Sequence, residues 1–282
     1  MALDLAGTEH DLSLSHGTVR YRQLGEGRPV VFIHGLLVDG ALWRKVTPHL
    51  SDGCRCVAPD LPLGSHRIAL PADANLTPPG LAKLVADFIE ALDTGPVTLV
   101  ANDTGGAIAQ LVATRHPDVL ERLVLTNCDA YENFLPPMFR PLQAAARVPG
   151  AITALMRSMR FDRLRRLPNA YGRLAKRPLA SELLDRWTEP ARTDPGVRRD
   201  LRKVLAGISN RYTLAAAERL ADFDRPTLIA WAPEDRFFKL RHAEGLASTL
   251  PNARLERVED SWAFVPEDRP DRLAGLIRDF LD

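Results

Sequence analysis

The stretch VTLVANDTGGAIAQ, residues 97–110, decides the fold. It begins as an apolar run typical of a buried strand, passes through small residues, and continues as a helix start. Asp103 lies at the apex, between Ala101 and Gly105, whose small size allows the strand to reverse sharply into the helix. A carboxylate there is stabilised by the positive end of the helix. The turn therefore presents an ionised, exposed acid; the alternative is that Asp103 only caps its helix.

Segments typical of strands and helices alternate on both sides of this unit. Strands are predicted over residues 10–14, 17–25, 28–35, 54–61, 96–103, 120–128, 225–235 and 253–260, and helices over 42–50, 78–92, 105–117 and 270–282. The first two strands have the form of a hairpin. The later alternation predicts an α/β fold, with a mostly parallel central sheet flanked by crossover helices.

The alternation stops between residues 130 and 222, where only helices are predicted. They cover residues 142–159, 181–191 and 197–208. We therefore expect an α/β core of residues 1–129 and 223–282 and an inserted helical cap of residues 130–222. Residues 140–220 hold 18 lysines and arginines against 7 aspartates and glutamates, a balance of +11. This excess indicates either a solvated helical surface or attraction of an anionic substrate or acidic partner.

Composition narrows the class of protein. The chain has 282 residues, 45% hydrophobic residues and a net charge of +1, as in soluble globular proteins. Its start lacks an export signal and no apolar run reaches membrane-spanning length, so we expect a cytoplasmic monomer or homodimer without membrane contact. Cys54, Cys56 and Cys128 are expected to be reduced core thiols, since no second Cys/His pair completes a metal site. We expect no metal, no other cofactor and no nucleic-acid partner.

Four features lie where strands are expected to end. They are His34-Gly35, Asp103, Asp235 and the segment DSWAFVPED, residues 260–268. Ligands of open α/β sheets bind at the carboxyl ends of the strands, so these features are expected to surround one pocket. The backbone N–H groups of Leu36 and Thr104 are the expected oxyanion donors.

The chain resembles the α/β-hydrolase superfamily along nearly its whole length. The resemblance rests on the segments VVFIHG, LWRKVTPHL, APDL, LVANDTGG, LIAWAPEDRFF and FVPEDRPDRLAGLIRDF. Aspartate at the apex resembles the haloalkane dehalogenases and epoxide hydrolases, in which a helical cap covers the pocket. The resemblance implies that Asp103 is a nucleophile that forms an ester with an alkyl carbon of a small to medium organic electrophile. It also implies that Asp235 orients a histidine, which activates the water that hydrolyses the ester.

The sequence departs from that family at the histidine. Ala263 stands where the histidine is expected, beside Trp262, and no histidine follows residue 242. Dehalogenases also have tryptophan where this chain has Thr104. Asp129 is an alternative acid and His66 an alternative acid or base. The remaining residues expected around the pocket are His34, Leu36, Thr104, Trp262 and Ala263.

Three functions stay open on the sequence. The first is hydrolysis of an epoxide or alkyl halide with a rearranged base. The second is a cyclisation, isomerisation or elimination in which Asp103 acts as a base, its basicity raised by a dry wall at Ala263 and Phe264. The third is a ligand-binding protein without catalysis, on a hydrolase scaffold that has lost its activity.

Overall fold

A computed structural model describes residues 5–282. The beginning of the segment predicted to lack an export signal, residues 1–4, lies outside the described residues. Eight strands form a single sheet in the order β1-β2-β4-β3-β5-β6-β7-β8. They are β1 (Thr8–Leu14), β2 (Gly17–Leu24), β3 (Arg28–Ile33), β4 (Cys54–Pro59), β5 (Val97–Asp103), β6 (Leu120–Cys128), β7 (Thr227–Trp231) and β8 (Ala253–Arg257).

The pairing of the strands confirms the expected mostly parallel sheet. β1 pairs with β2 and β2 with β4 in antiparallel fashion, and every later pair of neighbours is parallel. The central strands are buried on both faces, as the unbroken apolar runs predict: residues 30–33 of β3 are fully buried. Parallel strands end at one edge of the sheet, so the segments that follow β3, β5, β6 and β7 meet there.

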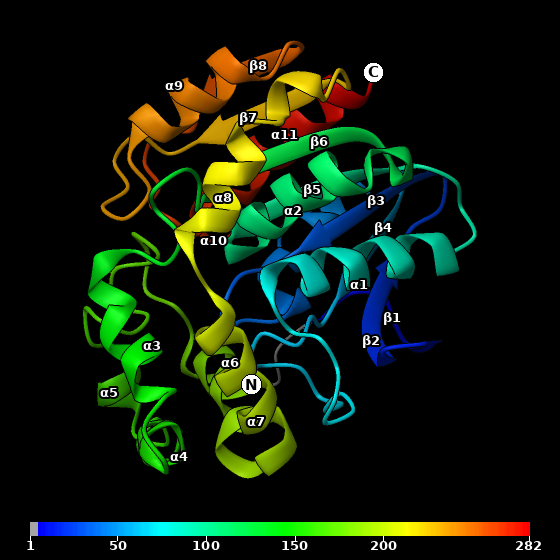
Figure 1. Cartoon of the computed structure of the whole chain (residues 1–282). Helices are drawn as coiled ribbons and strands as arrows, with labels where there is room; N and C mark the ends of the chain where they lie inside the picture. The colour runs from blue at the N-terminus through cyan, green and yellow to red at the C-terminus, as the bar shows by residue number, and fades with distance from the viewer. Residues whose placement is uncertain (1–4) are drawn as a thin grey trace.

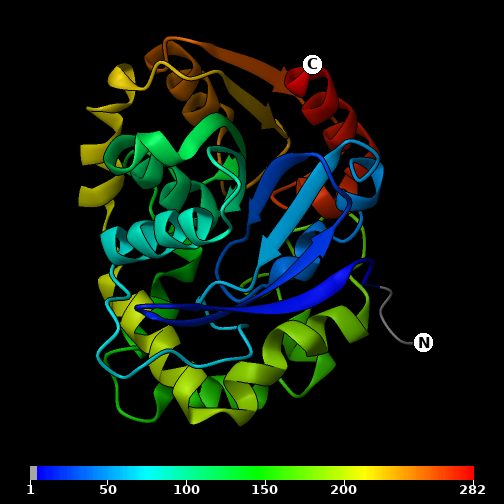
Figure 2. The same ribbon diagram turned by 90° about the vertical axis from the view of Figure 1, so that its right-hand side faces the viewer.

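Helices cover both faces of the sheet. α1 (Pro78–Ala91) and α2 (Thr104–Arg115) lie side by side on one face, whereas α11 (Pro270–Leu281) lies on the other (Figures 1 and 2). α9 (Leu240–Thr249) connects β7 to β8, and the short α10 (Val265–Asp268) precedes α11. α1 begins as its sequence predicts: Thr77 caps the N–H of Gly80, and Pro78 occupies the first turn.

Small residues let α2 pack directly on the strands. A Cβ on Gly105 would lie 2.5 Å from the carbonyl oxygen of His34, and one on Gly106 would lie 2.2 Å from Cβ of Cys128. Only glycine fits at either position without displacement of β3 or β6. The turn at Asp103 is therefore fixed from both sides by the packing of the helix that follows it.

Between β6 and β7 the chain is helical, and most of this part gathers at one end of the sheet (Figure 1). Its helices are α3 (Arg140–Ala145), α4 (Ala151–Ser158), α5 (Asp162–Arg165), α6 (Ser181–Thr193), α7 (Pro195–Gly207) and α8 (Asn210–Ala217). α8 packs against α2 rather than against the other five. We keep the division into a core of residues 1–129 and 223–282 and a cap of residues 130–222 as a proposal.

Two predicted helices differ from the structure. Residues 42–50 form two 3₁₀ turns, Gly40–Trp43 and Thr47–His49, because Pro48 cannot continue a hydrogen-bonded helix. Residues 142–159 divide into α3 and α4. The break falls at Pro149 and Gly150, which has a φ of +79° that suits glycine.

Candidate active site

Asp103 ends β5 in a backbone conformation that few residues adopt. Its φ of 57° and ψ of −133° turn the chain directly from the strand into α2. The turn has a close neighbour in the loop after β3, where a Cβ on Gly35 would lie 2.5 Å from Cβ and Oδ1 of Asp103. Glycine is therefore required at residue 35 for the two loops to meet.

A backbone N–H group binds the Asp103 carboxylate: the N–H of Thr104 donates to Oδ1. Burial raises the pKa of Asp103, while the N–H groups of Thr104 and Leu36 oppose the rise. These are the two N–H groups that the sequence predicts as oxyanion donors, and that role stays a prediction. Asp103 also lines the cavity described next, so its carboxylate is placed to meet a ligand there.

Asp103 opens into an apolar cavity of about 430 Å³ between the sheet and the helices above it. Leu36 and Leu37 line its floor beside Asp103, and Leu135, Pro136, Met138 and Phe139 line one side. The helical segment contributes Leu142, Ala145, Leu155, Met156, Met159, Leu164, Leu167, Ala170 and Leu174. A few convergent polar groups in an apolar pocket are typical of small-molecule sites.

Tyr171 is the aromatic hydroxyl of this cavity. Its OH donates to the carbonyl oxygen of Leu37 at 2.5 Å, which fixes the ring, and burial raises its pKa. The ring lies 5.6 Å from that of Trp187, whose indole N–H donates to Oδ1 of Asp39 at 2.9 Å. Helix α6 is thereby joined to the loop that follows β3.

Ala263, at the position expected for histidine, is fully buried. Its carbonyl oxygen accepts a hydrogen bond of 2.8 Å from Nδ2 of Asn102, the residue before the apex. The neighbouring Phe264 packs edge-on against Trp187 with ring centres 5.8 Å apart, and its N–H donates to the carbonyl of Leu174 at 2.7 Å. This side of the site is an apolar wall held by backbone hydrogen bonds.

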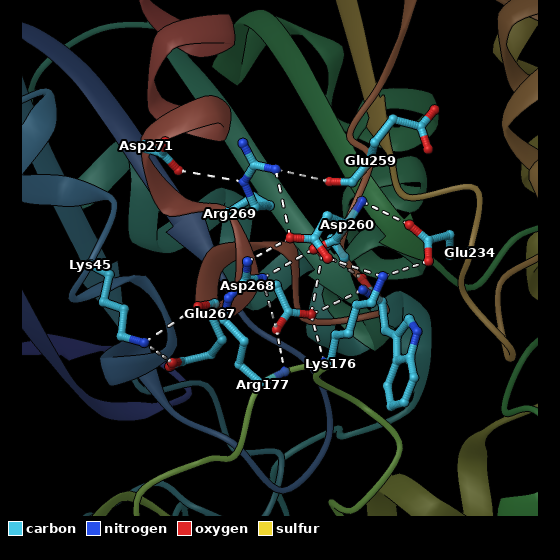
Figure 3. A network of polar contacts seen from close by, with 12 residues as sticks. Lys45, Lys176, Arg177, Glu234, Glu259, Asp260, Glu267, Asp268, Arg269 and Asp271 are labelled. Carbon is cyan, nitrogen blue, oxygen red and sulfur yellow. Dashed lines mark hydrogen bonds and ion pairs between the residues drawn. The ribbon is translucent and has the colours of Figure 1, made fainter.

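A polar network fixes that wall from behind (Figure 3). The carboxylate of Asp268 accepts the backbone N–H groups of Trp262, Lys176 and Arg177 at 3.0, 2.8 and 2.9 Å. Asp260 continues the network outward through ion pairs with Lys176 and Arg177. The segment after β8 is consequently tied to the loop between α5 and α6.

His34 and His66, the two histidines expected near the pocket, form their hydrogen bonds outside the cavity. His34 accepts the N–H of Leu61 at Nε2 and donates from Nδ1 to the carbonyl of Gly35, and burial lowers its pKa to about 4. His66 lies 3.2 Å from Oδ2 of Asp200. Neither lines the cavity, and across residues 5–282 no histidine does. The imidazoles that could have replaced the expected one serve to order loops instead.

Trp262 and Ala263 do not line the cavity, contrary to the expected placement. Trp262 instead lies under the guanidinium of Arg236, which is 4.8 Å from its ring centre, and borders a separate surface hollow. The hydrogen bonds of the segment to Asp268 turn the indole outward. Phe264 and Trp187, which pack on each other beside Ala263, are buried and do not line the cavity either.

Two further carboxylates are buried close to the turn at Asp103. Asp235 accepts from Nδ2 of Asn127 at 2.8 Å and from the N–H of Phe237 at 2.9 Å, and burial raises its pKa to about 7. Asp129 accepts from the N–H of Leu135 at 3.0 Å and faces the Thr104 hydroxyl at 3.4 Å. Burial and the charge of Asp103 raise its pKa well above the usual value. Asp235 has no imidazole to orient in this arrangement.

Other structural findings concern metals, membranes and thiols. Between residues 5 and 282 no group of three or more Cys, His, Asp or Glu side chains is arranged to hold a metal ion. Nor does the same range contain a helix whose length and apolarity would let it span a bilayer. The thiols of Cys54, Cys56 and Cys128 are buried and free.

Comparison with known proteins decides the family. A model described as "alpha/beta hydrolase fold" matches residues 28–270, which is most of the chain. This protein belongs to the alpha/beta hydrolase fold family. The eight-stranded, mostly parallel sheet flanked by helices is the fold of that family, as the sequence predicts.

The relatives of this α/β hydrolase include enzymes with different chemistry. It is 30% identical over 286 residues to a cis-3-alkyl-4-alkyloxetan-2-one decarboxylase of Xanthomonas campestris, covering 91% of this chain and 89% of that one. It is 27% identical over 270 residues to haloalkane dehalogenase 2 of Mycobacterium tuberculosis, covering 93% and 91%. An alpha/beta hydrolase fold protein from Burkholderia ambifaria superposes with a TM-score of 0.79 at 25% identity, covering 98% of each chain.

Sequence reasoning missed two side chains that shape the site of this hydrolase. Asn127 holds Asp235, and its own Oδ1 accepts the N–H of Ala232 at 2.7 Å. Tyr171 lines the cavity and donates its hydroxyl to the carbonyl of Leu37. Asn127 lies at the end of a predicted strand, which is a usable signal, whereas nothing in the sequence distinguishes Tyr171 from Tyr131 or Tyr212.

Proposed function

We propose that this α/β hydrolase cleaves a carbon–oxygen bond of an apolar, strained electrophile by nucleophilic attack of Asp103, and that it regenerates Asp103 by elimination rather than by hydrolysis. One observation carries the proposal. The Asp103 carboxylate opens into an apolar cavity, and no imidazole lines that cavity in the described part of the chain. In this proposal Asp103 is the nucleophile, and Ala263 stands where the imidazole that would activate water is expected.

A four-membered lactone, an oxetan-2-one, suits such a site. The free oxygen of Asp103 attacks C4 of the ring, the C4–O bond breaks, and its electron pair becomes the carboxylate of the opened substrate. The electrons of the bond between C3 and the carboxylate carbon then form the C3–C4 double bond. Carbon dioxide leaves, the bond from C4 to Asp103 breaks, and Asp103 returns as a carboxylate. Neither a water molecule nor a proton is consumed.

The surroundings favour these steps. The N–H of Thr104 holds Oδ1 of Asp103, and Asp103 lines the cavity. The apolar lining accommodates two alkyl substituents and keeps water away from the ester. The relationship to an oxetan-2-one decarboxylase supports this substrate class. In this proposal Asp235 and Asp129 keep the loops after β7 and β6 in place, and His34 and His66 have structural roles.

Hydrolysis of an alkyl halide or epoxide is the second candidate, and the dehalogenase relative supports it. Asp103 would displace the halide or open the epoxide in the same manner. The resulting ester would persist, because the imidazole that assists water is worth about 10²–10⁴ in rate. The two candidates therefore share a nucleophile and differ in how the ester is discharged.

The test compares three substrates of matched chain length: a cis-3,4-dialkyloxetan-2-one, a 1-bromoalkane and a terminal epoxide. We expect catalytic release of alkene from the lactone, measured by gas chromatography with mass detection. We expect the bromoalkane to leave an alkyl ester on Asp103, measured by intact mass and peptide mapping. Asp103→Asn should reduce both by at least about 10³-fold, and the exposed Asp118→Asn serves as the matched control.

The products separate the candidates. A hydroxy acid from the lactone, or an alcohol formed at a catalytic rate from the bromoalkane or the epoxide, would overturn the elimination route in favour of hydrolysis. Isomerised or cyclised product without any adduct would assign Asp103 the role of a base. Binding of all three substrates with neither adduct nor product would leave only a ligand-binding protein.

A further inference from the structure

A second hollow, of about 460 Å³, adjoins the apolar cavity and has the opposite character. Its walls come from the segment between β6 and α3 with the start of α3, from the loop between β7 and α9, from α9 itself, and from the segment between α5 and α6, which contributes Arg173. Figure 1 shows the first two of these running past each other at the left of the molecule. Its charged side chains are Arg140, Arg173, Arg236, Lys239, Arg241 and Glu132. We call this the basic hollow.

The cations of the basic hollow are not neutralised by neighbouring carboxylates. Its one acid, Glu132, is occupied by Arg241 at 3.2 Å and by His242 at 3.3 Å. Within residues 5–282, Arg140, Arg173, Arg236 and Lys239 take part in no ion pair, and the guanidinium of Arg236 lies over the ring of Trp262. Four positive charges from three segments of chain therefore converge on one concave surface.

A buried polar atom also lacks a partner at this place. His242 lines the basic hollow and is only 4% exposed, yet its Nδ1 makes no hydrogen bond. Buried polar atoms are almost always paired, so an Nδ1 without a partner in a residue that lines the hollow is a donor or acceptor that a small shift of the ring would offer to a bound group. The orphaned imidazole nitrogen is an observation independent of the surface charge.

The basic hollow and the apolar cavity share a wall. Pro136 and Met138 line both, and Phe139 of the cavity packs on Phe237 of the hollow with ring centres 5.2 Å apart. Met138 is 39% exposed and has a flexible side chain, so it can move aside for a ligand that passes from one space to the other. Apolar and cationic spaces in this order match a molecule with an apolar body and an anionic end.

We infer that the basic hollow binds the phosphate-bearing end of an amphiphilic ligand whose apolar part occupies the cavity above Asp103. The inference rests on the proposed function only in taking that cavity as the substrate site. Several guanidinium groups around a wide hollow suit the tetrahedral, doubly charged phosphate better than a single carboxylate, which one arginine can satisfy. The phosphate can belong to a lipid headgroup or to a phosphorylated carrier group, since the chemistry is the same.

The experiment measures binding of octyl phosphate, octanol and inorganic pyrophosphate to the full chain by calorimetry. We expect octyl phosphate to bind at least 10-fold more tightly than octanol, and pyrophosphate to compete with it. The double variant Arg236→Ala/Lys239→Ala should weaken octyl phosphate at least 10-fold and leave octanol unchanged. Arg157→Ala/Arg160→Ala, which removes two exposed arginines outside the hollow, is the matched control.

The outcomes are distinct from those for Asp103. Equal affinity for octyl phosphate and octanol, or equal losses in the hollow and control variants, would overturn the inference. Asp103→Asn should bind octyl phosphate as the unchanged protein does, so loss of turnover in that variant with retained binding tests the proposed function separately. Binding of pyrophosphate without competition against octyl phosphate would place the phosphate site elsewhere. Binding to vesicles that contain a dialkyl phosphatidic acid, with none to vesicles that lack it, would identify a lipid source, whereas binding of octyl phosphate alone would favour a free phosphorylated group.

Discussion

At the scale of the residue, Asp103 combines a strained backbone with a desolvated carboxylate. Neither is favourable by itself, and residues held in this way are concentrated at functional sites. The strain persists because α2 and the loop after β3 fix the chain on both sides, with glycine at each point of close approach. The free-energy cost of this backbone conformation is offset by the packing of α2 and of the loop after β3.

Gly35→Ala should therefore impair the site without unfolding the protein. The added Cβ would lie 2.5 Å from Oδ1 of Asp103, so the loop that carries the Leu36 N–H must move. We expect alkylation of Asp103 by the bromoalkane to slow by at least about 10-fold, measured by intact mass against time. Gly275→Ala is the control, because its Cβ meets nothing and alanine stabilises a helix interior by about 0.5–1 kcal/mol. Equal alkylation rates in both variants would contradict this picture.

The rate of alkylation should depend on pH through Asp103. Only the ionised carboxylate attacks, and burial raises its pKa above the roughly 3.9 of an unperturbed aspartate. As the pH falls, the rate should decline at a higher pH than it would for an exposed aspartate, and it should level off above that pKa. A rate that stays constant down to pH 4 would show that Asp103 is not desolvated.

Much of the residue-scale picture follows from the sequence. A small-residue turn between an apolar strand and a helix predicts the position of Asp103 and its hydrogen bond from the N–H of Thr104, because this local geometry is set by neighbours in the chain. The placement of Trp262 could not be predicted in the same way. Its direction depends on Asp268 and Arg236, whose positions follow from tertiary packing.

At the scale of the element, the segment after β8 is held by one carboxylate. Asp268 accepts three backbone N–H groups, two of them from the loop between α5 and α6. It thereby joins the segment after β8 to Lys176 and Arg177 of the loop between α5 and α6 (Figure 3). A short helix with few contacts of its own is positioned through hydrogen bonds to another part of the chain.

Asp268→Ala should loosen this connection. Three buried or half-buried N–H groups would lose their acceptor, which costs about 1–3 kcal/mol for each that stays unsatisfied. We expect a clear fall in the midpoint of thermal unfolding and weaker binding of octanol, measured by calorimetry. Asp271→Ala is the matched control, since its side chain is 70% exposed and makes only a long contact with Arg269. A loss no greater than that of the control would contradict the role of Asp268.

The elements themselves were predicted well where the hydrophobic pattern was long. The buried strands and the amphipathic α1 and α11 agree with the expected ranges. The errors fall at residues 42–50 and 142–159, where proline interrupts a helical pattern. In both segments the apolar residues keep a helical spacing on either side of the proline, although the helix itself cannot continue through it.

At the scale of the whole molecule, the free energy of unfolding includes the cost of burying carboxyl groups. Burial raises the pKa of both Asp60 and Asp235 to about 7. The folded protein therefore binds more protons than the unfolded chain between about pH 4 and pH 7. The contribution of such a group is complete below the pKa of the unfolded chain and is lost as the pH rises through the pKa of the folded state.

Asp235→Asn should accordingly stabilise the protein at high pH. The amide keeps an acceptor for Asn127 and carries no charge, so the gain relative to the unchanged protein should be on the order of 4 kcal/mol at pH 8. At pH 4 the two should be nearly equal. Denaturant unfolding at the two pH values measures the difference, with Asp271→Asn as the exposed control. A gain that is independent of pH would have another cause.

The place where the chain leaves and rejoins the sheet has a wider consequence. β6 and β7 are hydrogen-bonded neighbours, so the excursion between them departs and returns through a single seam. The segment between β6 and β7 can therefore be exchanged as one piece while the sheet that carries Asp103 stays unchanged. New substrate preferences would then arise by recombination at the junctions after β6 and before β7. Chimaeric proteins that combine this sheet with the inserted segment of another hydrolase offer a direct route to altered selectivity.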